Sequence, residues 1–250
     1  MNSFISWIGG KRILRNNIRG CFPEKKEYDR YVEVFGGAGW VLFAEEKHAA
    51  MEVFNDANGD LINLYRCVKY HCQELQRELQ WICSSRELLF DCMDQIHIRG
   101  LTDIQRAARF FVMVKCSFGA DLRTFGAKPR KWNKVVDYLS QVQKRLENVV
   151  IENNDFGKIL EIYDRDDTLF YLDPPYYKTE KYYQVEFSKG DHERLRESLE
   201  KIKGKFVLSY NDCPEIRKLY EGYSIKEVVR ANNLAAKKGS TFKELIIRNF

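Results

Sequence analysis

The 250-residue sequence predicts an α/β fold with a mainly parallel sheet, and three observations support this prediction. Short apolar runs typical of buried strands recur along the chain, at residues 30–35, 50–54, 149–151, 169–172 and 205–209. Segments whose apolar residues have helical spacing separate most of these runs, as in folds where helices cover a parallel sheet. The first run ends in a glycine-rich turn, which is typical of the strand–turn–helix units of such sheets.

The N-terminal part is expected to supply a short helix and the first two strands. The helix is predicted over residues 12–19, after a Gly-Gly turn. Residues 30–35 form the first strand, and Gly36-Gly37-Ala38-Gly39 is expected to open a helix that reaches about Lys47. The second strand, residues 50–54, ends at Asn55-Asp56.

The glycine turn and Asp56 together predict a ligand site. The N–H groups at the start of the predicted helix would suit a carboxylate or phosphate. Asp56 is placed to accept hydrogen bonds from ribose hydroxyls. A plain packing turn followed by a helix cap is the alternative. The chain has no P-loop Lys-Ser/Thr, which disfavours ATP hydrolysis.

The middle of the chain is predicted to be a largely helical insertion over residues 60–135, while residues 1–59 and 136–250 form one domain. Residues 117–131 form a loop or hairpin before a helix over about 133–147. This loop region mixes basic residues with Phe118, Phe125 and Trp132, the basic ones being Lys115, Arg123, Lys128, Arg130, Lys131 and Lys134. Such mixing is typical of nucleic-acid binding, although a solvated charged face has a similar composition.

The C-terminal part is expected to complete the sheet. After the strand at 149–151, Asp155-Phe156 opens a short helix, and a strand at 169–172 follows. A loop over 177–187 precedes a helix at 191–202, a strand at 205–209 and a helix at 214–220. Strands at 224–229 and 244–248 end the chain.

Asp173-Pro174-Pro175-Tyr176 follows the apolar run at 168–172 directly. The two prolines fix φ and remove two backbone donors, so the strand cannot continue. A stiff turn remains, with the Asp173 carboxylate, nearby carbonyls and an aromatic face. This set would suit a flat group with an exocyclic amino group, such as adenine. The alternative is an ordinary strand-ending turn with an exposed acid.

The composition describes an ordinary globular domain with 44% hydrophobic and 31% charged residues and a net charge of +5. No run of 18 apolar residues occurs, so no membrane partner is expected. The seven cysteines form no CxxC pair, which predicts reduced thiols and a cytoplasmic protein. Four of them lie near His71 at irregular spacings, so small buried side chains are favoured over a zinc site, and no metal is expected.

Four stretches together resemble the Dam-type DNA N6-adenine methyltransferases, in the order typical of the alpha group. They are Trp7-Ile8-Gly9-Gly10-Lys11, the glycine motif at 32–39, the acid motif at 54–58 and the Asp-Pro-Pro-Tyr motif at 173–176. The resemblance implies a Rossmann-like fold, S-adenosylmethionine as cofactor and double-stranded DNA as substrate. Directly after the last glycine this sequence has Trp40, where many members of that family have a small or hydroxyl-bearing residue.

The resemblance also implies roles for individual residues. The cofactor would contact Trp7, Lys11, Phe35, Gly37, Gly39, Asp56, Asp155, Phe156 and Asp173. The catalytic residues would be Asp173, Pro174, Pro175 and Tyr176. DNA would contact Phe118, Arg123, Lys128, Arg130 and Lys131, with Arg123 as the base reader and Phe118 as the intercalating ring.

The implied reaction is methylation of a flipped-out adenine. Tyr176 would stack on the base with its ring face, so the hydroxyl is not expected to matter, and Asp173 with the Pro174 carbonyl would accept from the amino group. One alternative is transfer to another amino group: cytosine N4, RNA adenine or a protein glutamine. Another is a catalytically inactive DNA-binding module. A cognate restriction nuclease is compatible with the first interpretation.

Overall fold

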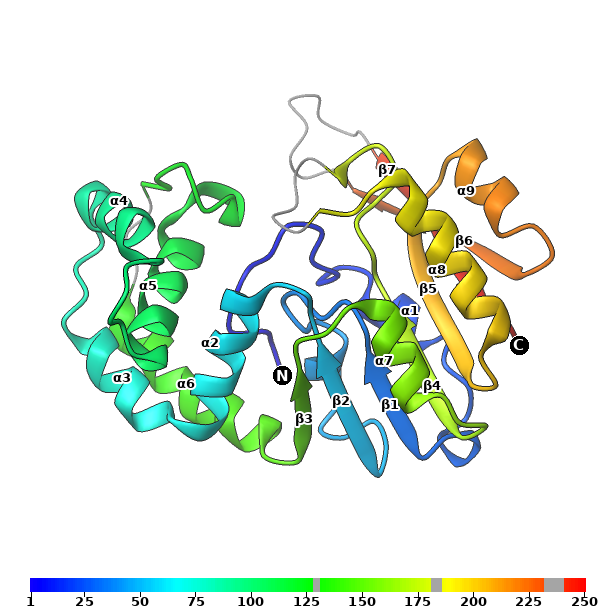
Figure 1. Cartoon of the computed structure of the whole chain (residues 1–250), viewed down its shortest axis with the longest axis horizontal. Helices are drawn as coiled ribbons and strands as arrows, with labels where there is room; N and C mark the ends of the chain where they lie inside the picture. The colour runs from blue at the N-terminus through cyan, green and yellow to red at the C-terminus, as the bar shows by residue number, and fades with distance from the viewer. Residues whose placement is uncertain (128–130, 181–185, 232–240) are drawn as a thin grey trace.

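The computed structural model describes residues 1–127, 131–180, 186–231 and 241–250. Its sheet has the strand order β3-β2-β1-β4-β5-β7-β6 (Figure 1). β7 is antiparallel to β5 and β6, and the other pairs are parallel. The strands are β1 (Arg30–Glu33), β2 (Met51–Asn55), β3 (Val149–Glu152), β4 (Thr168–Leu172), β5 (Lys205–Asn211), β6 (Ser224–Ala231) and β7 (Thr241–Arg248). The predicted mixed α/β fold with a mainly parallel sheet is confirmed.

Helices cover both faces of the sheet and also gather beyond β3, on the left of Figure 1. Side chains of α7, α8 and α9 pack on one face in a single apolar cluster. Those of α1, α2, α5 and α6 pack in a second cluster on the other face. The helices are α1 (Arg15–Arg19), α2 (Gly59–Tyr70), α3 (Cys72–Gln80), α4 (Arg86–Gln95), α5 (Asp103–Cys116), α6 (Trp132–Leu146), α7 (Phe156–Tyr163), α8 (Lys189–Lys201) and α9 (Pro214–Leu219), with 3₁₀ turns η1 (Lys25–Glu27), η2 (Leu42–Ala44) and η3 (Phe118–Ala120).

The helix predicted from the glycine turn to Lys47 is wrong, because only the short turn η2 forms there. The carbonyls that would continue a helix are bound by side chains instead. Arg145 donates to the Leu42 and Glu45 carbonyls, each at 2.9 Å, and its guanidinium forms a buried ion pair with Glu52 at 2.7 Å. The free N–H groups of a helix N-terminus, which were predicted to face a ligand here, are therefore not formed by the described residues, although the glycine turn itself lines a pocket. Helix α1 is also shorter than predicted, since it begins at Arg15.

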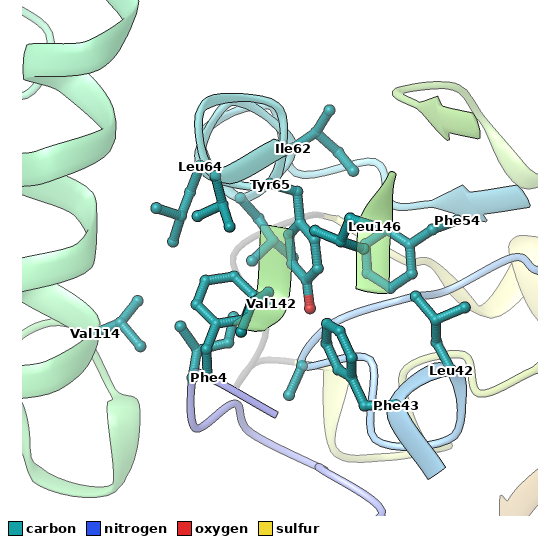
Figure 2. Close-up of a cluster of buried hydrophobic side chains, with 14 of the residues drawn as sticks. Phe4, Leu42, Phe43, Phe54, Ile62, Leu64, Tyr65, Val114, Val142 and Leu146 are labelled. Carbon is teal, nitrogen blue, oxygen red and sulfur yellow. The ribbon is translucent and has the colours of Figure 1, made fainter. Parts of the chain in front are cut away.

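An aromatic cluster beneath the glycine turn joins α2 to the sheet (Figure 2). The Tyr65 ring lies 4.3 Å from the Phe54 ring and 5.0 Å from the Phe4 ring, centre to centre. The Tyr65 hydroxyl donates to the Gly37 carbonyl at 3.1 Å. The core thus fixes the glycine turn from below, where β1 ends.

Within the described residues, no helix combines the length and the apolar character needed to cross a membrane.

Candidate active site

A pocket lies where the carboxyl ends of the parallel strands meet. The chain order reverses between β1 and β4, and this switch point is where ligands bind in open α/β sheets. Every residue predicted to contact the cofactor lines this one pocket: Trp7, Lys11, Phe35, Gly37, Gly39, Asp56, Asp155, Phe156 and Asp173. Pro175 also lines it, whereas the buried Pro174 and the half-buried Tyr176 are not among the lining residues.

The glycine turn brings three segments together at the end of β1. Gly37 and Gly39 have φ values of +49° and +65°, which favour glycine. A Cβ on Gly37 would lie 2.8 Å from Cδ1 of Trp7, so the N-terminal segment could not approach as it does. The Gly37 N–H donates to Oδ2 of Asp56 at 2.8 Å. The turn is therefore a closely packed wall of the pocket.

Asp56 and its neighbour Asn55 organise the ends of β1 to β3. Oδ1 of Asp56 accepts from the Asn58 N–H at 2.8 Å, and burial raises the pKa of Asp56 against the effect of its two backbone donors. Asn55 Nδ2 donates to the Val34 and Asn154 carbonyls at 2.8 and 3.1 Å. Sequence reasoning missed Asn55, although an amide at the end of an apolar strand was a signal.

Three phenylalanines form an aromatic part of the pocket wall. The rings of Phe35, Phe156 and Phe187 lie 5.7–5.9 Å apart, centre to centre. The Arg194 guanidinium lies 3.8 Å from the centre of the Phe156 ring. Arg194 also binds both carboxylate oxygens of Asp155, at 2.7 and 2.8 Å, and this pairing lowers the pKa of Asp155. The sequence did not identify Phe187 or Arg194, which come from a distant part of the chain.

Asp173 forms a buried ion pair at the end of β4. Its Oδ1 lies 2.7 Å from Nζ of Lys11, which also donates to the Gly9 carbonyl at 2.7 Å. The Ser209 hydroxyl donates to the same Oδ1 at 2.8 Å. Burial raises the pKa of Asp173, while Lys11 and Ser209 oppose the rise by favouring the charged form. The carboxylate is thus held in one position by two donors.

Tyr176 is held from two sides. Nζ of Lys11 lies 4.6 Å from the centre of its ring. The centre of the Tyr210 ring, on β5, lies 6.1 Å from the centre of the Tyr176 ring. The Tyr176 hydroxyl donates to Oε2 of Glu244, a buried residue of β7. Asp173 and Tyr176 therefore share Lys11 as a neighbour.

Glu33 is a second buried acid in the pocket wall, and sequence reasoning missed it. It accepts a hydrogen bond from the Tyr31 hydroxyl at 2.7 Å. Burial raises the pKa of Glu33 to about 8, and the nearby Asp173 charge adds to the rise. A Glu inside an apolar strand was the available signal.

Three of the predicted DNA-binding residues, Phe118, Arg123 and Lys131, lie on the segment between α5 and α6 and outside the pocket lining. A hairpin forms there, since Ser117 pairs with Phe125 and the Phe118 N–H donates to the Thr124 carbonyl at 2.6 Å. Phe118 is 62% exposed. Arg123 and Lys131 are exposed as well, and Lys128 and Arg130 lie outside the described residues.

Comparison with known proteins identifies the family. The sequence model of the D12 class N6 adenine-specific DNA methyltransferases matches residues 7–234. The chain belongs to this class. The predicted family, function and enzyme class are confirmed at this level. As a D12 class enzyme it carries out methyl transfer, and the family implies a methyl donor and a DNA substrate.

Curated relatives agree over nearly the full length. The chain is 30% identical to the Type II methyltransferase M1.LlaDCHI of Lactococcus lactis subsp. cremoris, over 100% of this chain and 96% of that protein. It is 29% identical to the Type II methyltransferase M.MjaIII of Methanocaldococcus jannaschii, over 99% and 98%. It is 25% identical to the DNA adenine methylase of Haemophilus influenzae, over 97% and 92%.

Proposed function

We propose that this D12 class enzyme transfers a methyl group from S-adenosylmethionine to N6 of a flipped-out adenine at a specific site in duplex DNA. The observation that carries the proposal is that one pocket joins the glycine turn to the Asp-Pro-Pro-Tyr turn. The rings at one end suit a purine, and the ion pair of Lys11 with Asp173 at the other suits charged groups. Such a pocket could hold a donor beside the amino group that receives the methyl.

The pocket fits S-adenosylmethionine in shape and in chemistry. A Cβ at Gly37 would clash with Trp7, so glycine is needed for these two walls of the pocket to lie as they do. Phe35 and Phe156 would face the adenine, Asp56 would accept from the ribose, and Lys11 would bind the methionine carboxylate. Trp7, Gly37 and Gly39 would bound the methionine end, with Asp155 beside the adenine and Asp173 near the amino group. When bound, the cofactor supplies an electrophilic methyl group on a sulfonium.

The residues of the Asp-Pro-Pro-Tyr turn would receive the target base. A stacked adenine cannot reach the pocket, so it must leave the duplex. The Tyr176 ring would stack on it, which contributes roughly 1–3 kcal/mol per base. The Asp173 carboxylate and the Pro174 carbonyl would accept from the amino group and orient its lone pair. Lys11 favours the charged form of Asp173, and Pro175 stiffens the turn. The rate enhancement would come from orientation and electrostatics.

Residues 60–135 would form the DNA-reading part, with residues 1–59 and 136–250 as the catalytic part. The hairpin carries the exposed Phe118 and Arg123, and the exposed Lys131 follows it at the start of α6, where a basic side chain would suit a phosphate. Arg123 would read a base, Phe118 would intercalate, and Lys128, Arg130 and Lys131 would bind the backbone.

A partner nuclease and the cellular location follow as further parts of the proposal. Relatives named Type II methyltransferases support a nuclease that cleaves the same site when it is unmethylated. A DNA substrate and seven free cysteines are consistent with work in the cytoplasm.

Methyl transfer to defined substrates tests the proposal. Purified protein is incubated with S-adenosylmethionine labelled in its methyl group and with duplex DNA, RNA or a protein extract. The expected result is label in N6-methyladenine from duplex DNA, and sequencing of the modified DNA gives the site. Label in cytosine, or in RNA or protein but not in DNA, would contradict the substrate assignment.

A further inference from the structure

A row of polar side chains runs across β5 and β7 beside the Asp-Pro-Pro-Tyr turn. Ser209 and Asn211 are two residues apart on β5, so their side chains share one face of the sheet. Asn211 and Glu244 are direct partners across the antiparallel pair, which places Glu244 on that same face. The three residues therefore form one continuous polar row, defined here as Ser209, Asn211 and Glu244.

Each member of the polar row binds a different residue of the Asp-Pro-Pro-Tyr turn or of Tyr177, which follows it. Ser209 donates to the Asp173 carboxylate at 2.8 Å. Asn211 binds the backbone of Tyr177 twice: its Oδ1 accepts from the Tyr177 N–H at 3.1 Å, and its Nδ2 donates to the carbonyl at 3.2 Å. Glu244 accepts from the Tyr176 hydroxyl.

The surroundings make these polar residues costly unless they are hydrogen-bonded. Ser209 is 1% exposed and Glu244 is 3% exposed. Their neighbours on the same face of the two strands, Val207 and Ile246, are buried apolar residues. A buried polar group destabilises a protein unless it finds a partner, and a buried charge does so more. The turn supplies partners to all three, so strands and turn constrain each other.

We propose that the polar row sets the position of the catalytic groups and that Glu244 is a positioning residue acting through the Tyr176 hydroxyl. This inference rests on the proposed function of the turn. Glu244 fixes the plane of the Tyr176 ring on which the base stacks, and Ser209 fixes the carboxylate that accepts from the amino group. The hydroxyl of Tyr176, which was predicted from the sequence not to matter, is then needed for activity although it does not touch the reacting atoms.

A double-mutant cycle on Tyr176→Phe and Glu244→Gln tests the proposal. Tyr176→Phe keeps the ring face and removes the donor, and Glu244→Gln keeps the size of the side chain and removes its charge. Each single variant is expected to lower kcat about tenfold, the usual effect of one hydrogen bond to a charged group. The double variant is expected to be no slower than the slower single variant, because both changes act on the same hydrogen bond: Tyr176→Phe removes its donor, and Glu244→Gln replaces its charged acceptor by a neutral amide oxygen.

Two further measurements separate positioning from simple loss of structure. The affinity for S-adenosylmethionine, measured by calorimetry, and the KM for DNA are expected to change less than about twofold, because catalysis by positioning is lost in kcat. With 2-aminopurine at the target adenine, both variants are expected to show brighter fluorescence in the DNA complex, because the flipped base stacks less well on a freely turning ring.

Tyr163→Phe is the matched control. It removes the hydrogen bond from Tyr163 to Glu152, which is 2.7 Å long and pairs the same residue types, at the end of α7, away from the Asp-Pro-Pro-Tyr turn. Its kcat is expected to stay within about twofold of wild type.

The outcomes distinguish this inference from the proposed function. Wild-type kcat in both single variants, or multiplicative losses in the double variant, would overturn the positioning role and leave the methyltransferase assignment intact. An equal loss in Tyr163→Phe would overturn it too, by showing general destabilisation. A wild-type protein that transfers no methyl group to DNA adenine would overturn the proposed function, and the inference with it.

Discussion

The Asp-Pro-Pro-Tyr turn and the hairpin between α5 and α6 carry the two halves of the proposed activity, and they are built differently. In the turn, Asp173 and Tyr176 are each bound by side chains from other segments, Lys11 and Glu244 among them. In the hairpin, the described hydrogen bonds are local. Asp121 accepts from the backbone of Arg123 and Thr124, both at 2.9 Å, and buried Leu122 anchors the tip.

The difference matches what each region has to do. Methyl transfer needs groups fixed to a fraction of an ångström, which long-range hydrogen bonds from a rigid sheet provide. Reading DNA needs exposed side chains that can reach a groove, and a short loop on a rigid scaffold provides those. Changes in the turn should therefore affect the reaction rate, and changes in the hairpin should affect the choice of DNA.

The largest effect is expected from Asp173→Ala. The substitution removes the charged acceptor for the amino group and leaves Lys11 without its buried partner, so kcat should fall at least about a hundredfold. The measurement is the labelled methyl-transfer assay on duplex DNA, with Asp166→Ala, at an exposed loop position, as the matched control. If a folded Asp173→Ala protein kept most of the wild-type rate, the Asp-Pro-Pro-Tyr turn would not be catalytic, and the contrast between the turn and the hairpin would be wrong.

The next effect is expected from Gly37→Ala. The new Cβ would meet Trp7 at 2.8 Å in a residue with φ of +49°, so the Trp7 segment must shift and cofactor affinity should fall about tenfold or more. Calorimetry with S-adenosylmethionine measures this. Gly222→Ala is the control, because Gly222 also has positive φ, +94°, with nothing within 4 Å of a Cβ. If both variants lose affinity equally, backbone strain rather than the clash with Trp7 is responsible.

A third effect is expected on the pH dependence of kcat when Lys11, the partner of Asp173, is replaced. Burial raises the pKa of Asp173 and Lys11 lowers it, so Lys11→Met should raise it further. The charged carboxylate is a stronger acceptor for the amino group than the protonated acid, so activity is present above this pKa and is lost as the pH falls through it. The acid limb of kcat should therefore move to higher pH. Lys158→Met, at an exposed surface pair, should leave the limb in place. An unshifted limb in Lys11→Met would show that Asp173 does not control it.

The comparison also explains which parts of the molecule the sequence could predict. Asp56 and Asp173 follow apolar strands directly, so the parallel sheet alone was enough to bring them to one edge. Ser209, Arg194 and Glu244 are ordinary polar residues in distant elements, and only the folded chain pairs them with the turn and with Asp155.

The helix predicted from the glycine turn to Lys47 is wrong for the same reason: contacts from a distant part of the chain decide the structure there. The local pattern from the glycine turn to Lys47 favoured a helix, but Arg145, about a hundred residues later, binds the Leu42 and Glu45 carbonyls. A contact between residues so far apart in the chain leaves no local periodicity to detect. Local patterns thus located the strand ends and the acids after them, and they missed the side chains that hold these acids in place.

The smallest effects on rate are expected in the hairpin, where Arg123→Ala and Lys131→Ala should differ in kind. An Arg that reads a base contributes roughly 1–3 kcal/mol of discrimination, so Arg123→Ala should lower the ratio of cognate to random-site methylation about tenfold. Lys131→Ala should weaken binding to all sequences alike and reduce the salt slope by about one. Both side chains are exposed and lie outside the pocket lining, so cofactor affinity should not change in either variant. Methylation of cognate and scrambled duplexes at several salt concentrations measures both quantities. An unchanged ratio in Arg123→Ala would transfer the reading role to another residue of the hairpin, and a loss of cofactor affinity would mean that the two regions are coupled and not separate as their hydrogen bonds indicate.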